Sequence, residues 1–214
     1  MWQRYMDSQY RRPFGLVGRW IGRTMARQHQ PENRWTVDLL DVQPSDHVLE
    51  VGFGPGIAVE AVAQRISGGL VAGVDFSPTM VAAARRRNAA RVRAGMVDLR
   101  LGDAARLPFA DGVFDKAFSI HSIYFWPEPL AALREIRRVL KPNGLLILTV
   151  LPKEKWNPEH PELAGTPECI PYSGDDLTAL LTQAGFGDLH SEADANQTAA
   201  SNFSVLGRAL LASR

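Results

Sequence analysis

The sequence predicts an α/β protein with a mostly parallel, doubly wound sheet and helices on both of its faces. Two observations carry this prediction. From His47 onward, short apolar runs alternate with segments of helical periodicity, which is the pattern of parallel strands joined by crossover helices. The chain also has 214 residues, 45% of them hydrophobic, enough for one sizeable core and too few for two full domains.

Strands are expected where apolar runs meet glycines or other turn residues. Residues 48–53 form an apolar run that leads into three glycines, in the stretch "LEVGFGPGIAV". Such a run is typical of a strand that is buried on both faces. Six further runs are expected to be strands: residues 70–75, 97–101, 114–121, 145–151, 188–193 and 203–209.

Helices are expected between these strands. Residues 56–66 carry apolar side chains at the spacing i, i+3, i+4 and i+7, which predicts an amphipathic helix. Ser77 followed by Pro78 is typical of a helix N-cap and of the first helical position. Residues 130–140 form a third helical pattern, and we expect the turn "KPNG" to close it.

A long loop is expected between the fifth strand and the next helix. Residues 152–172 contain five prolines and show no periodicity, and loops of this length are often lids or binding loops. Ser173, with Asp176 three residues later, predicts a capping box for the helix that follows, and Gly185 is expected to end that helix. We interpret residues 152–172 as a substrate loop.

Composition excludes several classes of protein. The formal net charge of +1 favours no acidic partner, and the single cysteine, Cys169, excludes an intramolecular disulfide and a cysteine-based zinc site. We predict no metal site. The N-terminus lacks the apolar core of a signal peptide, and the longest apolar run is too short to span a bilayer. These features predict a cytoplasmic protein.

The glycine loop, defined as residues 52–56, is the first candidate binding site. Glycines allow a sharp turn and a close approach of backbone N–H groups to a ligand. The third glycine comes one position too early for the dinucleotide fingerprint G-x-G-x-x-G, where Ile57 stands instead. The Gly-Lys-Ser/Thr of a phosphate-binding loop is absent. This pattern favours a nucleoside over a pyrophosphate.

Two aspartates at strand ends strengthen this interpretation. Asp75 ends the second strand, 19 residues after Gly56, where a carboxylate can accept both hydroxyls of a ribose. Asp103 ends the third strand, where a carboxylate can accept the amine of an adenine. Alternatively, Asp75 caps a helix, and Asp103 belongs to a Gly-Asp turn.

Four motifs occur in a fixed order: "VLEVGFGPG", "GVDFSPTMV", "GDAARLPFADGVFDKAFS" and "ALREIRRVLKPNGLLIL". Together they resemble the motifs of class I S-adenosylmethionine (SAM)-dependent methyltransferases, most closely the branch of ubiquinone and menaquinone biosynthesis and related small-molecule enzymes. The resemblance covers residues 45–210. It implies a Rossmann-like, seven-stranded sheet with an antiparallel last strand, and S-adenosylhomocysteine as the product. The chain departs from the family at Pro55 and in "KPNG".

The resemblance also implies a set of cofactor-binding residues. Glu50 and the glycine loop, with Gly52, Phe53, Gly54 and Gly56, would hold the methionine part of SAM. Asp75 would hold the ribose. Phe76 and Met80 would lie beside the adenine, and Asp103 and Ala104 would close on its amine and ring.

Methyl transfer needs a general base only when the acceptor must lose a proton early. The candidate is His121 in "SIHSIYFW", at the carboxyl end of the fourth strand, because an imidazole has a pKa close to neutrality. Tyr124 and Trp126 are candidate aromatic walls for the acceptor or the sulfonium. Alternatively, His121 lines the cofactor or packs under a loop, and the aromatic residues belong to the core.

Residues 1–44 are expected to form a helical cap, and residues 45–214 the methyltransferase domain. Phe14, Val17, Ile21 and Met25 would share one face of a helix, with arginines on the opposite face. Such a helix can fold over the cofactor or lie on an anionic membrane as a peripheral contact. A second basic run, residues 85–93, is interpreted as a solvated helix face, and nucleic acid is not expected as a partner.

The leading hypothesis is methyl transfer from SAM to a small, apolar or aromatic molecule by in-line displacement. A second is methylation of a phospholipid headgroup, with the basic N-terminal helix docked on the membrane. A third is a SAM-binding protein without methyl transfer. A fourth, a nicotinamide oxidoreductase, is disfavoured by Ile57 and by the order of the motifs.

Overall fold

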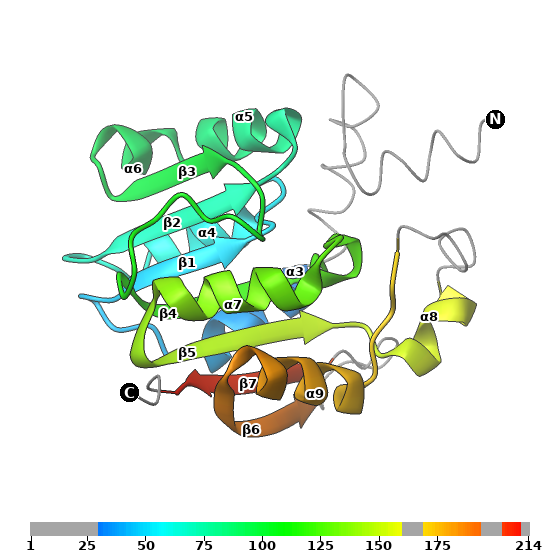
Figure 1. Ribbon diagram of the computed structural model, residues 1–214. Coiled ribbons are helices and arrows are strands. Elements are labelled where there is room, and N and C mark those ends of the chain that lie inside the picture. The colour runs from blue at the N-terminus through cyan, green and yellow to red at the C-terminus, as the bar shows by residue number, and fades with distance from the viewer. Residues whose placement is uncertain (1–29, 160–168, 194–202, 211–214) are drawn as a thin grey trace. The chain divides into compact units, whose positions relative to one another are not determined.

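The computed structural model describes residues 30–159, 169–193 and 203–210, and shows a seven-stranded mixed sheet with helices packed around it (Figure 1). The strand order is β3-β2-β1-β4-β5-β7-β6. The strands are β1 (His47–Val51), β2 (Leu70–Asp75), β3 (Val97–Leu101), β4 (Phe114–Ile120), β5 (Leu140–Val150), β6 (Phe186–Ala193) and β7 (Phe203–Ala209). The helices are α3 (Gln30–Leu39), α4 (Ile57–Ala63), α5 (Pro78–Arg87), α6 (Ala89–Arg93), η1 (Ile123–Phe125), α7 (Pro129–Val139), α8 (Lys153–Glu159) and α9 (Gly174–Ala184).

The first of two compact units comprises Met1–Asp103. Its three strands are parallel, with β2 between β1 and β3. Every residue of β2 after Leu70 is buried, as expected for a central strand of a covered parallel sheet. Helix α4 packs on β1 and β2, and α5 packs on β2 and β3. The carboxyl ends of β1 and β2 therefore lie side by side within this unit.

The second unit comprises Ala104–Arg214. Strands β4 and β5 are parallel, whereas β7 runs antiparallel to both β5 and β6. Helices α7 and α9 contact each other over the same face of these strands (Figure 1). The predicted antiparallel last strand is confirmed.

The strands expected from the sequence are all present, and β2, β3 and β7 have the expected bounds. The segment "KPNG" differs from the expected turn, because β5 already begins at Leu140. Pairing jumps from Phe114↔Leu140 to Lys116↔Leu145, so the residues between form a bulge opposite Asp115. Asn143 lies in this bulge with a φ of 64°. The bulge lets α7 run directly into the strand without a separate loop.

Both predicted helix caps are confirmed. The Ser77 hydroxyl accepts the N–H of Met80 at 3.4 Å, and Pro78 begins α5. Ser173 and Asp176 form a reciprocal capping box for α9, which ends at Gly185 in the left-handed region. Among the described residues, three short helices were not predicted. Helix α6 follows α5 after one residue, η1 follows β4, and α8 occupies the start of the expected substrate loop.

Some expectations lie outside the described residues, namely the helix over residues 14–25 and the part of the substrate loop at 160–168. Helix α3 is the described part of the expected cap, and it packs on α4 within the first unit. No helix among the described residues is long and apolar enough to cross a membrane.

Candidate functional site

The glycine loop requires glycine at two positions for different reasons. Gly54 has a φ of 50°, and no atom of the described residues lies within 4 Å of where its Cβ would stand. Gly56 has a φ of 77°, and its Cβ would lie 2.7 Å from the Cβ of Ala84 on α5. A side chain at Gly56 would therefore both strain the backbone and push α5 away.

Glu50, in β1, places a buried carboxyl next to this loop. Its side chain is 3% exposed, and one oxygen accepts the backbone N–H of Val59 in α4. The other oxygen, Oε2, has no hydrogen-bond partner among the described residues. Burial, together with the nearby charge of Asp75, raises the pKa of Glu50 to about 8. A cation placed at Oε2 would satisfy this oxygen and favour the ionised carboxylate.

Asp75 ends β2 and holds the glycine loop through the backbone. Its Oδ2 accepts the N–H of Gly54 and its Oδ1 accepts the N–H of Ser77, both at 2.8 Å. Burial raises the pKa of Asp75 to about 6, although the two N–H groups favour the charged form. Each oxygen has a further lone pair. The carboxylate can therefore accept one ribose hydroxyl on each oxygen.

The remaining predicted cofactor residues differ in exposure. The ring of Phe53 is buried against Gly73, where a Cβ would lie 2.6 Å from it, and Met80, in α5, is 3% exposed. Phe76 is 38% exposed beyond the end of β2. Asp103 is exposed at the end of the first unit, and Ala104 is half-buried at the start of the second. Phe76 and Asp103 are thus the exposed members of the predicted cofactor set among the described residues.

The donor set in the first unit fits the cofactor that the resemblance implies. SAM carries an ammonium, which suits the Glu50 oxygen that has no partner among the described residues, and a ribose diol, which suits the two oxygens of Asp75. Among the described residues, no group of three or more His, Cys, Asp or Glu side chains could hold a metal ion.

The second unit gathers the predicted acceptor-side residues at the end of β4. His121 follows β4 with a φ of 51°, in the left-handed region that non-glycine residues seldom adopt. Its backbone N–H donates to Thr149 at 3.0 Å, and its Nδ1 lies 3.2 Å from the Tyr124 hydroxyl. The two rings stack with centroids 6.1 Å apart. The backbone geometry thus brings His121 and Tyr124 together.

The hydroxyl of Tyr124 also ties η1 to β5. It accepts the backbone N–H of Leu151 and donates to the carbonyl of the same residue at 3.3 Å. Burial raises the pKa of Tyr124 well above its usual range, so the phenol keeps its proton. The structure therefore gives Tyr124 three polar neighbours, one of which is His121.

Aromatic residues surround this pair. The ring of Trp156 in α8 lies 4.3 Å from that of Tyr124, and Trp126 donates its Nε1–H to the Ser122 hydroxyl at 3.2 Å. Sequence reasoning named Trp126 but missed Trp156. Trp156 is an isolated aromatic residue in a segment that the sequence predicts to be an irregular loop. Nothing in the local sequence indicates that it packs against η1.

The basic run of residues 85–93 is largely tied to the backbone. Arg85 donates to the carbonyl of Leu99, with Nη2 at 2.6 Å, and Arg91 donates to that of Ala63 at 3.1 Å. Arg87 donates to the carbonyl of Pro55 at 3.1 Å. These guanidinium groups lie at the surface, yet they stabilise connections between elements of the first unit.

Known proteins with similar sequences include methyltransferases. Residues 49–148 match the family described as a methyltransferase domain. The uncharacterized methyltransferase YdaC of Bacillus subtilis (strain 168) is 30% identical over 168 residues, which cover 78% of this chain and 86% of YdaC.

Two further relatives are matched over shorter stretches. The O-methyltransferase cnsE of Penicillium expansum is 35% identical over 144 residues, 66% of this chain and 52% of cnsE. A demethylmenaquinone methyltransferase of Corynebacterium kroppenstedtii is 39% identical over 107 residues, 50% of this chain and 42% of that enzyme. The chain thus spans about half the length of these two relatives.

Among solved structures, the fold resembles a chain of the complex between the Haloferax volcanii Trm112 methyltransferase activator and its methyltransferase. The TM-score is 0.77 at 22% identity, over 90% of this chain and 94% of the other. At this identity the likeness shows the fold alone. Combined with the match to YdaC and the methyltransferase domain, it leads to one conclusion: this protein belongs to the class I SAM-dependent methyltransferases.

Proposed function

We propose that this enzyme transfers the methyl group of SAM to a small, apolar or aromatic molecule. One observation carries the proposal. Two buried carboxyls, Glu50 and Asp75, flank the glycine loop; Oε2 of Glu50 has no partner among the described residues, and each oxygen of Asp75 keeps a lone pair. This set of hydrogen-bond acceptors is matched to an amino acid and a ribose joined in one ligand.

The residues of the first unit bind and orient SAM. Glu50 accepts the ammonium of the methionine part, and Asp75 accepts the ribose hydroxyls. Phe76 supplies an exposed aromatic face for the adenine, since this residue, directly after Asp75, is 38% exposed. Asp103, the last residue of the first unit, accepts the amine of the adenine.

The bound sulfonium supplies the methyl group and is an excellent leaving group, so the protein contributes mainly orientation. Holding the nucleophile, methyl carbon and sulfur in line can lower the barrier by about 7–11 kcal/mol. A dry site also favours the reaction, because charge disperses as the methyl group moves. The aromatic side chains of Tyr124, Trp126 and Trp156 are buried, as such a site requires.

His121 is the proposed general base for an acceptor with a hydroxyl or an acidic carbon. The Tyr124 proton has two possible acceptors, the Leu151 carbonyl and His121 Nδ1. When the phenol donates to Leu151, His121 must donate from Nδ1, and Nε2 is then the basic nitrogen. Tyr124 acts in this proposal as a positioning residue that selects the tautomer.

The acceptor class is inferred from the relatives as well as from the site. One relative is named an O-methyltransferase and another a demethylmenaquinone methyltransferase. Aromatic side chains around Tyr124 suit an acceptor that is apolar or aromatic. A phospholipid headgroup is the alternative acceptor, and the following experiment distinguishes it from a small apolar or aromatic molecule.

The experiment is label transfer from methyl-labelled SAM into a lysate of the native host. The product is divided into organic-extractable, aqueous and macromolecular fractions. Label in a non-phospholipid organic product is expected. Label in phospholipid would replace the proposed acceptor with a headgroup. Label confined to the aqueous or macromolecular fraction, or no transfer despite SAM binding, would contradict the proposal.

A further inference from the structure

Two consecutive residues at the end of α5 reach the second half of the glycine loop. The Nε–H of Arg87 donates to the carbonyl of Pro55 at 3.1 Å, and the Nδ2 of Asn88 donates to the carbonyl of Gly56 at 3.2 Å. Both carbonyls belong to the glycine loop. The loop is thus held from the side of α5 through two neighbouring peptide groups.

Helix α5 packs directly against the glycine loop at the point where these hydrogen bonds form. Ala84, one turn before Asn88, is fully buried against Gly56, whose Cβ would lie 2.7 Å from that of Ala84. Asn88 is itself 2% exposed, and its Nδ2 also donates to the carbonyl of Ala84 at 3.1 Å. The amide of Asn88 therefore connects the end of α5 and the loop at one buried point.

The orientation of a peptide carbonyl fixes the opposite N–H of the same planar unit. When Pro55 and Gly56 point their carbonyls at α5, the N–H groups of Gly56 and Ile57 are directed away from Arg87 and Asn88. The Gly56 N–H closes a turn onto the carbonyl of Phe53 at 2.9 Å. This turn holds Gly54 where its own N–H meets Asp75.

We propose that Arg87 and Asn88 are positioning residues for the methionine end of SAM, which they serve by fixing the Pro55 and Gly56 carbonyls. Neither residue touches the ligand in this assignment. The inference rests on the proposed binding of SAM by the first unit. It gives the basic run at the end of α5 a role in cofactor affinity, beyond a solvated helix face.

Arg87 offers the clean test, because its side chain is 38% exposed and the fold does not depend on its burial. Arg87→Met keeps the length of the stem and removes every donor. Arg86→Met makes the same change at the neighbouring exposed residue of α5 and is the matched control. Glu60→Gln removes the charge of the ion-pair partner of Arg87 but keeps the hydrogen bond from the Nε–H of Arg87 to the carbonyl of Pro55.

The dissociation constants of SAM and of methylthioadenosine, which lacks the amino-acid part, are measured by calorimetry with each variant. Arg87→Met is expected to raise the dissociation constant of SAM about threefold to tenfold, which is the effect of losing one such hydrogen bond. Affinity for methylthioadenosine and the melting temperature are expected to stay unchanged. Arg86→Met and Glu60→Gln are expected to bind both ligands as the wild type does.

Asn88→Ala is also expected to lower the affinity for SAM but not for methylthioadenosine. It is expected to lower the melting temperature as well, because it removes a buried amide. Unchanged SAM affinity in Arg87→Met would overturn the inference. So would an equal loss for both ligands, or a loss in Glu60→Gln as large as that in Arg87→Met. Failure of the wild type to bind SAM would instead contradict the proposed function, and the inference with it.

Discussion

Glu50 and Asp75 are coupled carboxyls near the carboxyl ends of two paired strands, β1 and β2. The charge of Asp75 adds to burial in raising the pKa of Glu50 to about 8, while the pKa of Asp75 itself rises to about 6. An ionised Asp75 therefore disfavours the ionisation of Glu50. The site is consequently arranged for a ligand that brings positive charge and hydroxyl donors.

The first prediction concerns the pH dependence of stability without ligand. Between the ordinary pKa of 4.5 and about 8, folded Glu50 retains a proton that the unfolded chain has lost. The free energy of unfolding therefore falls as pH rises through this range. Glu50→Gln removes this contribution, so the variant is expected to melt above the wild type at pH 8, with the difference shrinking toward pH 5.

Differential scanning calorimetry of the ligand-free protein at pH 5, 6.5 and 8 measures this effect. Glu60→Gln, at an exposed site on α4, is the control and is expected to follow the wild type at each pH. Asp75 acts in the same direction between its ordinary pKa of 3.8 and about 6. Parallel melting curves for wild type and Glu50→Gln would show that Glu50 is ionised in the folded chain.

The second prediction is that Asp75→Asn weakens SAM about 100-fold or more, because a neutral amide loses two charge-assisted hydrogen bonds to the ribose. The amide also turns a donor toward the N–H of Gly54 or Ser77. Calorimetric titration with SAM measures the loss. Asp98→Asn, on the neighbouring strand β3, is the control and is expected to bind normally. Equal affinities would mean that the ribose lies elsewhere.

The third prediction tests whether His121 acts as a general base or only lines the acceptor site. Asn tolerates the φ of 51° better than Ala does, so His121→Asn removes the base with little backbone strain. It is expected to lower kcat about 100-fold with a hydroxyl acceptor and to leave SAM affinity unchanged. Steady-state kinetics over pH 6–9 measure this, and the pH dependence that the imidazole gives to the wild-type kcat should disappear.

Tyr124→Phe provides the companion measurement. It keeps the ring against Trp156 but removes the hydroxyl that the Leu151 backbone and His121 share. A lower kcat with an altered pH profile is expected, together with a stability loss of about 1–3 kcal/mol from the unpaired Leu151 groups. Full activity in His121→Asn would show that the acceptor needs no base.

Much of this fold follows from local pattern. The buried runs of β2 and β3 and the caps at Ser77 and Ser173 depend on residues adjacent in sequence, so the sequence alone predicts them. Long-range contacts are different. Nothing local indicates that Asn88 meets Gly56, 32 residues away, because an asparagine at a helix end is equally typical of a simple cap.

The candidate site shows the same division. Asp75 is predictable from its distance after the glycine loop, but its hydrogen bond to Gly54 arises only when β1 and β2 pair. The prediction of a turn at "KPNG" was wrong in part. Pairing with β4 extends β5 back to Leu140 and leaves a bulge that contains Asn143. Tertiary pairing overrides turn propensity at such positions.

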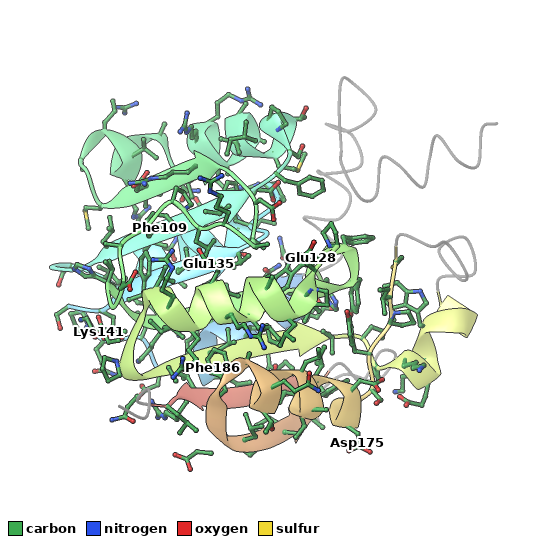
Figure 2. The ribbon with its side chains drawn as sticks, viewed as in Figure 1. Phe109, Glu128, Glu135, Lys141, Asp175 and Phe186 are labelled. Carbon is green, nitrogen blue, oxygen red and sulfur yellow. The ribbon has the colours of Figure 1, made fainter. Side chains whose placement is uncertain are left out.

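The last prediction concerns the loop before β4, which α7 holds in the second unit (Figure 2). Glu135 accepts the N–H of Leu107 at 3.0 Å and the Nε–H of Arg138 at 2.7 Å. Arg138 in turn donates to the carbonyls of Leu107 and Phe109. The hydrogen bond from Arg138 is the main reason that the pKa of Glu135 lies below its usual value.

A lowered pKa means that Glu135 stabilises the folded chain above its unfolded pKa of 4.5, and that this contribution is lost as pH falls through the lowered value. Glu135→Gln is therefore expected to melt below the wild type at pH 7, and the two are expected to converge in acid. Because the group is near the surface, the loss at pH 7 should be about 1 kcal/mol or less. Glu128→Gln, an exposed residue before the same helix (Figure 2), is the control. If both variants melt alike, the contact between α7 and the loop does not contribute to stability through the charge of Glu135.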